Sequence, residues 1–403
     1  MTRLPIELVE TRRVQLPTRT DFRWNGLERP LGEVLVVRVS SGEHEGFGES
    51  VPLPDWGGAF GSPYGETVSI DQIVIHEQLA PFVLGRDAMA IGEVLASARR
   101  GIIGYPYALA ALDIALHDLV GRAAGVPVHM LLGGRARRTI PLAHMIGLMP
   151  EEQALEEASR CLEEGCRAFQ VKTGPDANRD VSLVRRLREL CGDSVVLRVD
   201  ANCGYGPPKR ALDIVRALAD AGANFVEKPV GGREELAMMT RHSALPIMAD
   251  EDCWTPHDAV RLVADGVADI ISVYVAKSGG IAGASTVARV AAAAGLPHDL
   301  NGSLETGIGN AASLQVAAAS QAELLASVLP VSAPTSSGST AAFGRYFTDD
   351  VITSPMKLVD GSLEVPDDPG LGFEVDRGKL DHYTVERRES RLGSGGEAEA
   401  SGE

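Results

Sequence analysis

Three acidic side chains in the middle of the chain have the types and the spacing to hold a metal ion. Asp200, Glu227 and Asp250 each follow a short apolar run, and they lie 27 and 23 residues apart (200 to 227 and 227 to 250). If these runs are neighbouring parallel strands, the carboxylates meet at one edge and repel one another strongly unless a cation neutralises them. Mg²⁺ prefers a few carboxylates together with water or substrate oxygens. The pattern therefore predicts a Mg²⁺ site, although each acid alone would also suit a salt bridge or a helix cap.

Two lysines flank these acids in the same pattern. Lys172 ends the run FQVKT, one predicted strand before Asp200, and Lys277 ends the run SVYVAK, one predicted strand after Asp250. In a closed barrel the two amines would approach a bound molecule from opposite sides. Burial and a nearby dication lower the pKa of a lysine from about 10.4, which makes it usable as a base. We therefore predict that Lys172 and Lys277 move a proton, against the simpler possibility that they reach into solvent.

Further polar residues near the predicted strand ends are candidates to bind substrate. Gln170 and Asn202 share the two-residue alternation of the first lysine and the first carboxylate, so their side chains should face the same interior. His298 and Asp299 follow in LPHDLNG, and Glu305 follows in LETGIG. Glu305 could bond a substrate oxygen. A histidine at the barrel mouth could replace a lysine as the base, and an acid-sugar dehydratase would then be the function.

The elements that must position these residues are visible as an alternation of apolar runs and helical segments. Within residues 136–340, about eight apolar runs are each followed by a helical pattern of roughly 12–15 residues. Runs this rich in Val, Ile, Leu and Phe are typical of strands that are buried on both faces. Because polar residues follow several different runs, we predict an α/β fold with a (β/α)₈-type TIM barrel rather than an open sheet.

Different patterns flank the predicted barrel. Residues 1–135 first alternate like strands and then become helical, which predicts an N-terminal α+β capping domain. Residues 341–388 contain strand and turn patterns, and we predict that they pack back on the capping domain. The small and acidic residues 389–403 are predicted to form a disordered tail.

The composition argues against several classes of function. The 403-residue chain carries a formal net charge of −17, which argues against nucleic acid or an anionic membrane as a partner. Its five cysteines form no C-x-x-C pair, and no stretch approaches the roughly 20 apolar residues that a membrane-spanning helix needs. We therefore expect a cytoplasmic protein that acts on a small-molecule carboxylate.

The motifs together resemble the mandelate racemase/muconate lactonizing enzyme family of the enolase superfamily over about residues 5–385. The matching segments are GFGE (46–49), ALAALDIALHDLVGRAAGVPVHMLLGG (108–134), VKTG (171–174), VDAN (199–202), EKP (227–229), ADE (249–251), AKSGGI (276–281) and LETGIG (304–309). The resemblance implies a capped barrel with one Mg²⁺, and it implies a homo-oligomer. It also implies metal ligands and two general acid/base lysines, which would be Asp200, Glu227, Asp250, Lys172 and Lys277.

One departure from the family concerns the second barrel strand. The family usually has Lys-x-Lys there, whereas this chain has Gln170-Val171-Lys172. The missing lysine would lie near the substrate carboxylate, so its loss could change which carboxylates bind.

The resemblance also implies that loops of the capping domain set specificity, and it makes Arg23, Trp24, Asp55 and Trp56 candidates to line the lid. An aromatic face beside an acid suits a small cationic or zwitterionic molecule. We therefore expect removal of the α-proton of an amino-acid-type or imino-acid-type substrate through an enediolate, by a racemase/epimerase or a dehydratase similar to cis-3-hydroxy-L-proline dehydratase. A muconate-type cycloisomerase, an acid-sugar dehydratase and a non-catalytic barrel binding protein remain the alternatives.

Overall fold

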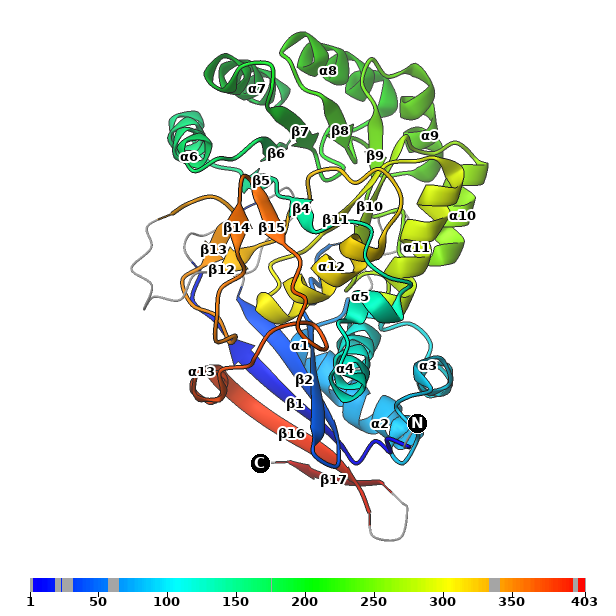
Figure 1. The fold of residues 1–403 in the computed structure, drawn as a ribbon. Coiled ribbons are helices and arrows are strands. Elements are labelled where there is room, and N and C mark those ends of the chain that lie inside the picture. The colour runs from blue at the N-terminus through cyan, green and yellow to red at the C-terminus, as the bar shows by residue number, and fades with distance from the viewer. Residues whose placement is uncertain are drawn as a thin grey trace.

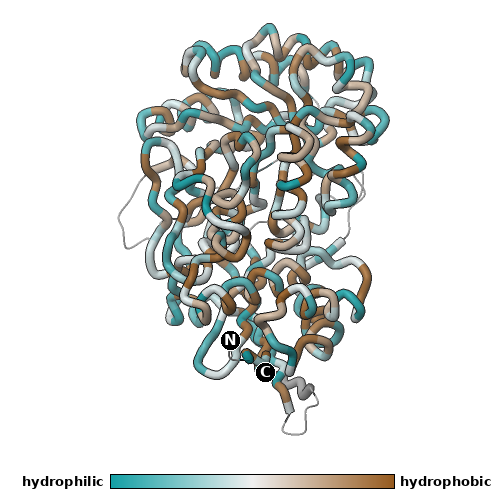
Figure 2. The backbone as a smooth tube through the Cα atoms, turned by 45° about the vertical axis from the view of Figure 1, so that its right-hand side comes forward, coloured by the Kyte–Doolittle hydropathy of each residue, from teal (hydrophilic) through white to brown (hydrophobic). Residues whose placement is uncertain are grey.

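The computed structural model describes residues 3–18, 23, 32–56, 65–174, 176–332, 341–393 and 398–402 of the chain. An antiparallel sheet with its helices forms the lower part of the molecule in Figure 1, and a parallel sheet ringed by helices forms the upper part. Hydrophobic stretches concentrate toward the middle of both parts, and hydrophilic ones toward the outer loops (Figure 2). Within the described part of the chain, none of the helices has the length and apolar character that crossing a lipid bilayer requires.

The antiparallel sheet contains strands from both ends of the chain. Its order is β17-β16-β1-β2-β3, with bounds β1 (Leu8–Gln15), β2 (Glu33–Ser41), β3 (His44–Ser50), β16 (Thr384–Leu392) and β17 (Ala398–Gly402). The predicted disordered tail at 389–403 is therefore wrong where the structure describes it. β16 continues to Leu392 beside β1, and β17 pairs with β16. Pairing with β16 satisfies backbone groups that β1 would otherwise expose along an unpaired edge.

Helices cover one face of this sheet (Figure 1). They are α1 (Val68–Val74), the π-helix η2 (Ile75–Leu79), α2 (Ala80–Val83), α3 (Ile91–Ala98) and α4 (Pro106–Ala124). α4 is buried along most of its length, as expected of a helix that is apolar all round. It comes close to β3 because Gly46 and Gly48 have no side chain. A Cβ atom on Gly48 would lie 2.0 Å from the carbonyl oxygen of Ala111.

The parallel sheet follows the order of the sequence from β5 to β11. Its strands are β5 (His144–Ile146), β6 (Ala168–Lys172), β7 (Val196–Asp200), β8 (Phe225–Glu227), β9 (Ile247–Ala249), β10 (Ile270–Tyr274) and β11 (His298–Asn301). The helices outside it are α6 (Glu151–Glu163), α7 (Ala177–Cys191), α8 (Pro208–Asp220), α9 (Arg233–His242), α10 (Pro256–Ala264), α11 (Ile281–Ala294) and α12 (Gly307–Ala319). Every strand is followed by a helix, which matches the predicted alternation.

The ring is closed by single bridges and not by an eighth regular strand. Residues 324–328 form parallel bridges to Leu142, which lies before β5, and to His298 of β11. β12 (Val331–Ser332), near the end of the range predicted for the barrel, pairs instead with β13 (Arg345–Phe347). The predicted α/β fold, an enolase-like TIM barrel with an N-terminal α+β cap, is confirmed, with its last strand reduced to short contacts.

The segment after the barrel contacts both parts of the molecule. β14 (Leu358–Val359) and β15 (Ser362–Glu364) form a small sheet with β4 (Thr139–Pro141), and α5 (Val128–Leu131) lies between the cap and the barrel in sequence. α13 (Arg377–Tyr383) then leads directly into β16 of the cap sheet.

Candidate active site

The parallel register of the barrel brings the predicted acids and the first lysine together. Lys172 lies opposite Asp200 on the neighbouring strand, and Asp200 lies opposite Glu227 on the next one. Asp250 directly follows β9, the strand after that. All four side chains are buried. The structure therefore places one lysine and three carboxylates in a row along the carboxyl end of the sheet.

The two lysines lie at opposite ends of this row. The Nζ atom of Lys172 donates to Asp200 Oδ2 at 2.6 Å and to Asn202 Oδ1 at 3.1 Å. The Nζ atom of Lys277 donates to Asp250 Oδ1 at 2.7 Å and to the backbone oxygen of the same residue at 2.7 Å. Lys172 ends β6 and Lys277 follows β10, so three strands separate them.

Two amides bond the same groups. The side-chain nitrogen of Gln170 donates to Asp200 Oδ2 at 3.0 Å and to Glu227 Oε2 at 2.9 Å. Asn202 has a left-handed backbone with φ of 38°, and its side-chain nitrogen donates to Glu251 Oε1 at 3.3 Å. Gln170, a predicted substrate-binding residue, thus donates to two of the three carboxylates.

Arg198 is a site residue that the sequence prediction missed. Its Nε atom donates to Glu227 Oε2 at 2.7 Å, and a terminal nitrogen donates to Asp299 Oδ2 at 2.5 Å. The side chain is fully enclosed beneath the row of acids. The available signal was its place two residues before Asp200 in the same strand, because alternate residues of a strand face the same side.

Crowding of these buried groups perturbs their ionisation. Burial, together with the neighbouring carboxylates of Asp200 and Asp250, raises the pKa of Glu227 well above its usual range despite the opposing effect of Arg198. Burial works to lower the pKa of Lys172, but Asp200 and Glu227 outweigh it, and the net pKa is raised. The lowered Lys172 pKa that the sequence suggested presupposes a dication beside the amine, and it stays a prediction.

The chemistry of the three acids fits a divalent cation. The Oε1 atom of Glu227 is buried without a hydrogen-bond partner among the described residues, and hard cations prefer carboxylate oxygens. As they stand, no three His, Cys, Asp or Glu side chains in the described part of the chain are grouped to hold a metal. Nitrogen atoms of Lys172 and Gln170 bond the carboxylate oxygens instead. The donor set fits Mg²⁺ once these nitrogens give up their bonds.

His298 and Asp299 do not lie at the barrel mouth, so their predicted position is wrong. His298 begins β11, at the end of that strand away from the acids, and its Nε2 atom lies 2.6 Å from Ser320 Oγ. Burial lowers its pKa to about 4. Asp299 points into the barrel and accepts the bond from Arg198. Asp299 therefore belongs to the interior of the barrel, whereas His298 contacts the C-terminal end of the outer helix α12.

The predicted lid residues are only partly described. Trp56 is buried and packs against Tyr274, with ring centroids 5.5 Å apart. Both line a small cavity of about 30 Å³ beside Lys172. Asp55 is exposed, and the backbone oxygen of Arg23 accepts a bond from Leu148. The remaining predicted lid residue, Trp24, lies outside the described residues.

Glu305 lies next to the segment that lines this cavity. Gly302, Ser303 and Leu304 contribute to the lining, whereas Glu305 itself is buried behind them. Its Oε2 atom accepts a bond from the backbone nitrogen of Ser303 at 2.5 Å. Burial raises its pKa to about 7. The structure therefore places Glu305 as a support of the pocket wall.

Two family models match most of the chain. The model described as "Mandelate racemase / muconate lactonizing enzyme, N-terminal domain" matches residues 30–133, and the one described as "Enolase C-terminal domain-like" matches residues 153–379. The first covers β2, β3 and the helices of the cap, and the second covers the barrel strands from β6 onward and most of the segment after them.

Several characterised proteins are similar over nearly their whole length. Muconate cycloisomerase 1 of Rhodococcus opacus is 31% identical over 95% of this chain and 100% of its own. Cis-3-hydroxy-L-proline dehydratase of Roseibium aggregatum is 29% identical over 92% of this chain and 96% of its own. The structure of 2-chloromuconate cycloisomerase from Rhodococcus opacus superposes with a TM-score of 0.84 at 29% identity, covering 94% of this chain and 99% of that one. The chain therefore belongs to the mandelate racemase/muconate lactonizing enzyme family of the enolase superfamily and is an enzyme of the lyase or isomerase type.

Proposed function

We propose that this enzyme removes the α-proton of a small carboxylate in a Mg²⁺-dependent reaction, with Lys172 and Lys277 as its acid and base. The observation that carries the proposal is the placement of two buried amines at opposite ends of a row of three buried carboxylates. A bare carboxylate α-carbon is very weakly acidic, so the site must stabilise the negative charge that develops as the proton leaves.

The residues divide this work between them. Asp200, Glu227 and Asp250 would hold Mg²⁺, which supplies positive charge next to the substrate carboxylate. The amine of Lys172 takes up the proton on one face of the α-carbon. The amine of Lys277 holds a proton on the other face and returns it in a racemisation, or passes it to a leaving group in an elimination.

An amino-acid-type or imino-acid-type substrate is the preferred class. The Trp56 and Tyr274 rings lie beside Lys277, whose Nζ atom is 4.6 Å from the Tyr274 ring centroid and 5.9 Å from that of Trp56. Aromatic faces that attract one ammonium group can attract another. The 29% identity to cis-3-hydroxy-L-proline dehydratase supports a dehydratase acting on such a substrate.

A muconate-type cycloisomerase is the second candidate, on two observations. Muconate cycloisomerase 1 is 31% identical over nearly the whole chain. The described residues that line the small cavity also include apolar side chains such as Leu53, Met145 and Val328, and no acid that would pair with a substrate ammonium. Turnover of an unsaturated diacid, without exchange of any amino or imino acid, would select this candidate.

Proton exchange in D₂O with Mg²⁺ tests the division of labour between the lysines. We would test a panel of amino, imino and sugar acids. We expect the wild-type enzyme to exchange the α-proton of an amino or imino acid for deuterium. Lys172→Met and Lys277→Met should each abolish exchange from one face, because each removes one amine. Lys209→Met, at an exposed position on α8, is the control and should leave exchange unchanged. If neither buried lysine matters, the assignment fails.

Thermal unfolding with and without Mg²⁺ tests the metal site independently of turnover. A ligand at 100 times its Kd stabilises the folded state by about 2.7 kcal/mol, so wild type should unfold at a higher temperature with Mg²⁺. Asp200→Asn should lose most of this gain, whereas Asp220→Asn, at an exposed position on α8, should keep it. Equal gains in both variants would place the ion elsewhere.

The proposal also covers the surroundings of the enzyme. We infer a cytoplasmic homo-oligomer. None of the five cysteines is joined to another in a disulfide, which agrees with a reducing compartment. Sedimentation of the purified chain at two concentrations would give its oligomeric state.

A further inference from the structure

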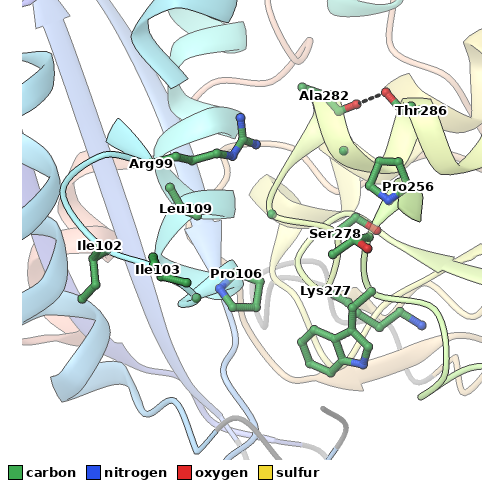
Figure 3. Close-up of a pocket in the computed structure, with 15 residues that line it drawn as sticks. Arg99, Ile102, Ile103, Pro106, Leu109, Pro256, Lys277, Ser278, Ala282 and Thr286 are labelled. Carbon is green, nitrogen blue, oxygen red and sulfur yellow. Dashed lines mark hydrogen bonds between the residues drawn. The ribbon is translucent and has the colours of Figure 1, made fainter. Parts of the chain in front are cut away.

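A second and larger cavity lies behind Lys277, between the cap and the barrel (Figure 3). Its volume is about 610 Å³, within the range of small-molecule sites. On the cap side it is lined by the segment between α3 and α4 and by the start of α4. On the barrel side it is lined by the start of α10, the turn after Lys277 and the first turns of α11.

The two facing walls of this cavity are largely apolar. Ile102, Ile103 and Leu109 come from the cap, and Trp254 and Pro256 come from the barrel. Ile103 is 96% exposed. An isoleucine side chain left in water forgoes the stabilisation that burial would bring. A ligand with an apolar, ring-sized body between the walls would cover it.

The polar groups of the cavity favour an anion. Arg99 lies at its opening, and Figure 3 shows its guanidinium directed toward the barrel wall. No Asp or Glu is among the described lining residues, although the chain as a whole carries a net charge of −17. The other cation, Lys277, directs its amine away from the cavity to Asp250.

We propose that this cavity is a second binding site, for a small molecule with an apolar ring and one carboxylate. The ring lies between Ile102 and Trp254, and the carboxylate pairs with Arg99. The site is separate from the catalytic pocket, but it shares a wall with it, because Lys277 lines this cavity with its stem while its amine bonds Asp250. Binding here does not depend on the proposed function, whereas an effect of the ligand on turnover would act through Lys277.

Calorimetric titration of the full chain with 2-naphthoate tests the site. Wild type should bind one molecule per chain. Arg99→Gln should weaken binding about tenfold, because it removes a charge-assisted bond. Thr286→Phe, at an exposed position on α11, places a ring in the cavity and should abolish binding.

Arg100→Gln is the matched control. Arg100 is the next residue, is also exposed, donates to Ser97 Oγ at 2.9 Å and does not line the cavity, so this change should leave the affinity unchanged.

Two outcomes would overturn the proposal. The first is the absence of saturable binding to wild type. If the sedimentation coefficient of Thr286→Phe then also differs from that of wild type, this face is an interface between copies of the chain. The second outcome is equal affinity of the Arg99→Gln and Arg100→Gln variants, which would place naphthoate in the catalytic pocket or elsewhere.

Discussion

Arg198 forms bonds to two buried carboxylates. These carboxylates lie on strands that are not neighbours in the sheet. It reaches Glu227 on β8 and Asp299 on β11 from its own place on β7. Removing one partner of a buried ion pair costs about 3–5 kcal/mol, since the remaining charge stays buried without compensation. Arg198 is therefore expected to matter for stability as well as for the placement of Glu227.

Arg198→Met tests this expectation by urea denaturation. We expect the free energy of unfolding to fall by about 3–5 kcal/mol. Arg186→Met is the control, because Arg186 pairs with Glu151 and Glu152 at the surface and should matter little. Equal effects of the two substitutions would show that the buried network does not stabilise the barrel.

At the residue scale, site residues at the ends of strands could be predicted from the sequence, whereas a site residue inside a strand was missed. Lys172, Asp200 and Glu227 were predictable because parallel register aligns the ends of neighbouring strands. Arg198 was missed, since a charge within an apolar run gives no sign of what it meets across the barrel. His298 was misplaced because LPHDLNG mixes polar and apolar residues, and the pattern does not say where its strand begins.

At the scale of elements, the approach of α4 to β3 fixes how the cap is built. A Cβ atom on Gly48 would meet the backbone of Ala111, which cannot move aside as a flexible side chain could. Overpacking a tight contact of this kind costs about 1–3 kcal/mol. The GFGE motif thus has a structural role through its glycines.

Gly48→Ala is therefore expected to lower the free energy of unfolding by about 1–3 kcal/mol, as measured by denaturation. Gly92→Ala is the opposite case, because Gly92 lies within α3 and a Cβ atom there meets nothing within 4 Å. It should be neutral or stabilising by up to about 1 kcal/mol, as alanine favours helix. Two equally destabilised variants would mean that the close approach of α4 is not the cause.

Strands could be predicted where the sequence has a long apolar run. The last strand of the barrel and the C-terminal strand of the cap sheet were predicted less well. Seven barrel strands appeared in the expected order, whereas the eighth is reduced to bridges at 324–328. The acidic composition of the tail suggested disorder, but Thr384–Leu392 forms a strand because β1 offers it a long antiparallel partner. Composition describes a segment by itself and cannot include such a partner.

At the scale of the whole molecule, buried carboxylates join the cap to the barrel at the start of α12. Glu49 of β3 accepts bonds from the backbone nitrogen of Thr306, at 2.7 Å, and from its hydroxyl. Asp350 accepts a bond from the backbone nitrogen of Gly307 at 3.0 Å. The two acids approach the same helix end from segments on either side of the barrel in sequence, so their ionisation affects the contact between the two parts.

Stability should therefore fall as the pH rises through neutrality. Burial raises the pKa of Glu49 from 4.5 to about 8, with Glu305 and Asp350 adding to the effect, although its bonds to Thr306 oppose it. A carboxyl group whose pKa is higher in the folded state binds more protons there than in the unfolded chain. Its stabilising effect is complete below about pH 4.5 and is lost as the pH rises through about 8. Each unit of this shift corresponds to about 1.4 kcal/mol.

Glu49→Gln should flatten this dependence, because the amide keeps an oxygen to accept the bonds from Thr306 but has no proton to lose. We expect the drop in the free energy of unfolding between about pH 5.5 and about pH 8.5 to be smaller in the variant than in wild type by more than about 1.4 kcal/mol. Some slope should remain, since burial also raises the pKa values of Glu305 and Asp350 to about 7. Glu156→Gln, at an exposed position on α6, controls for the loss of one charge and should keep the wild-type slope. A Glu49→Gln slope equal to that of wild type would mean that Glu49 is ionised in the folded enzyme across this range, and that its bonds to Thr306 outweigh its burial.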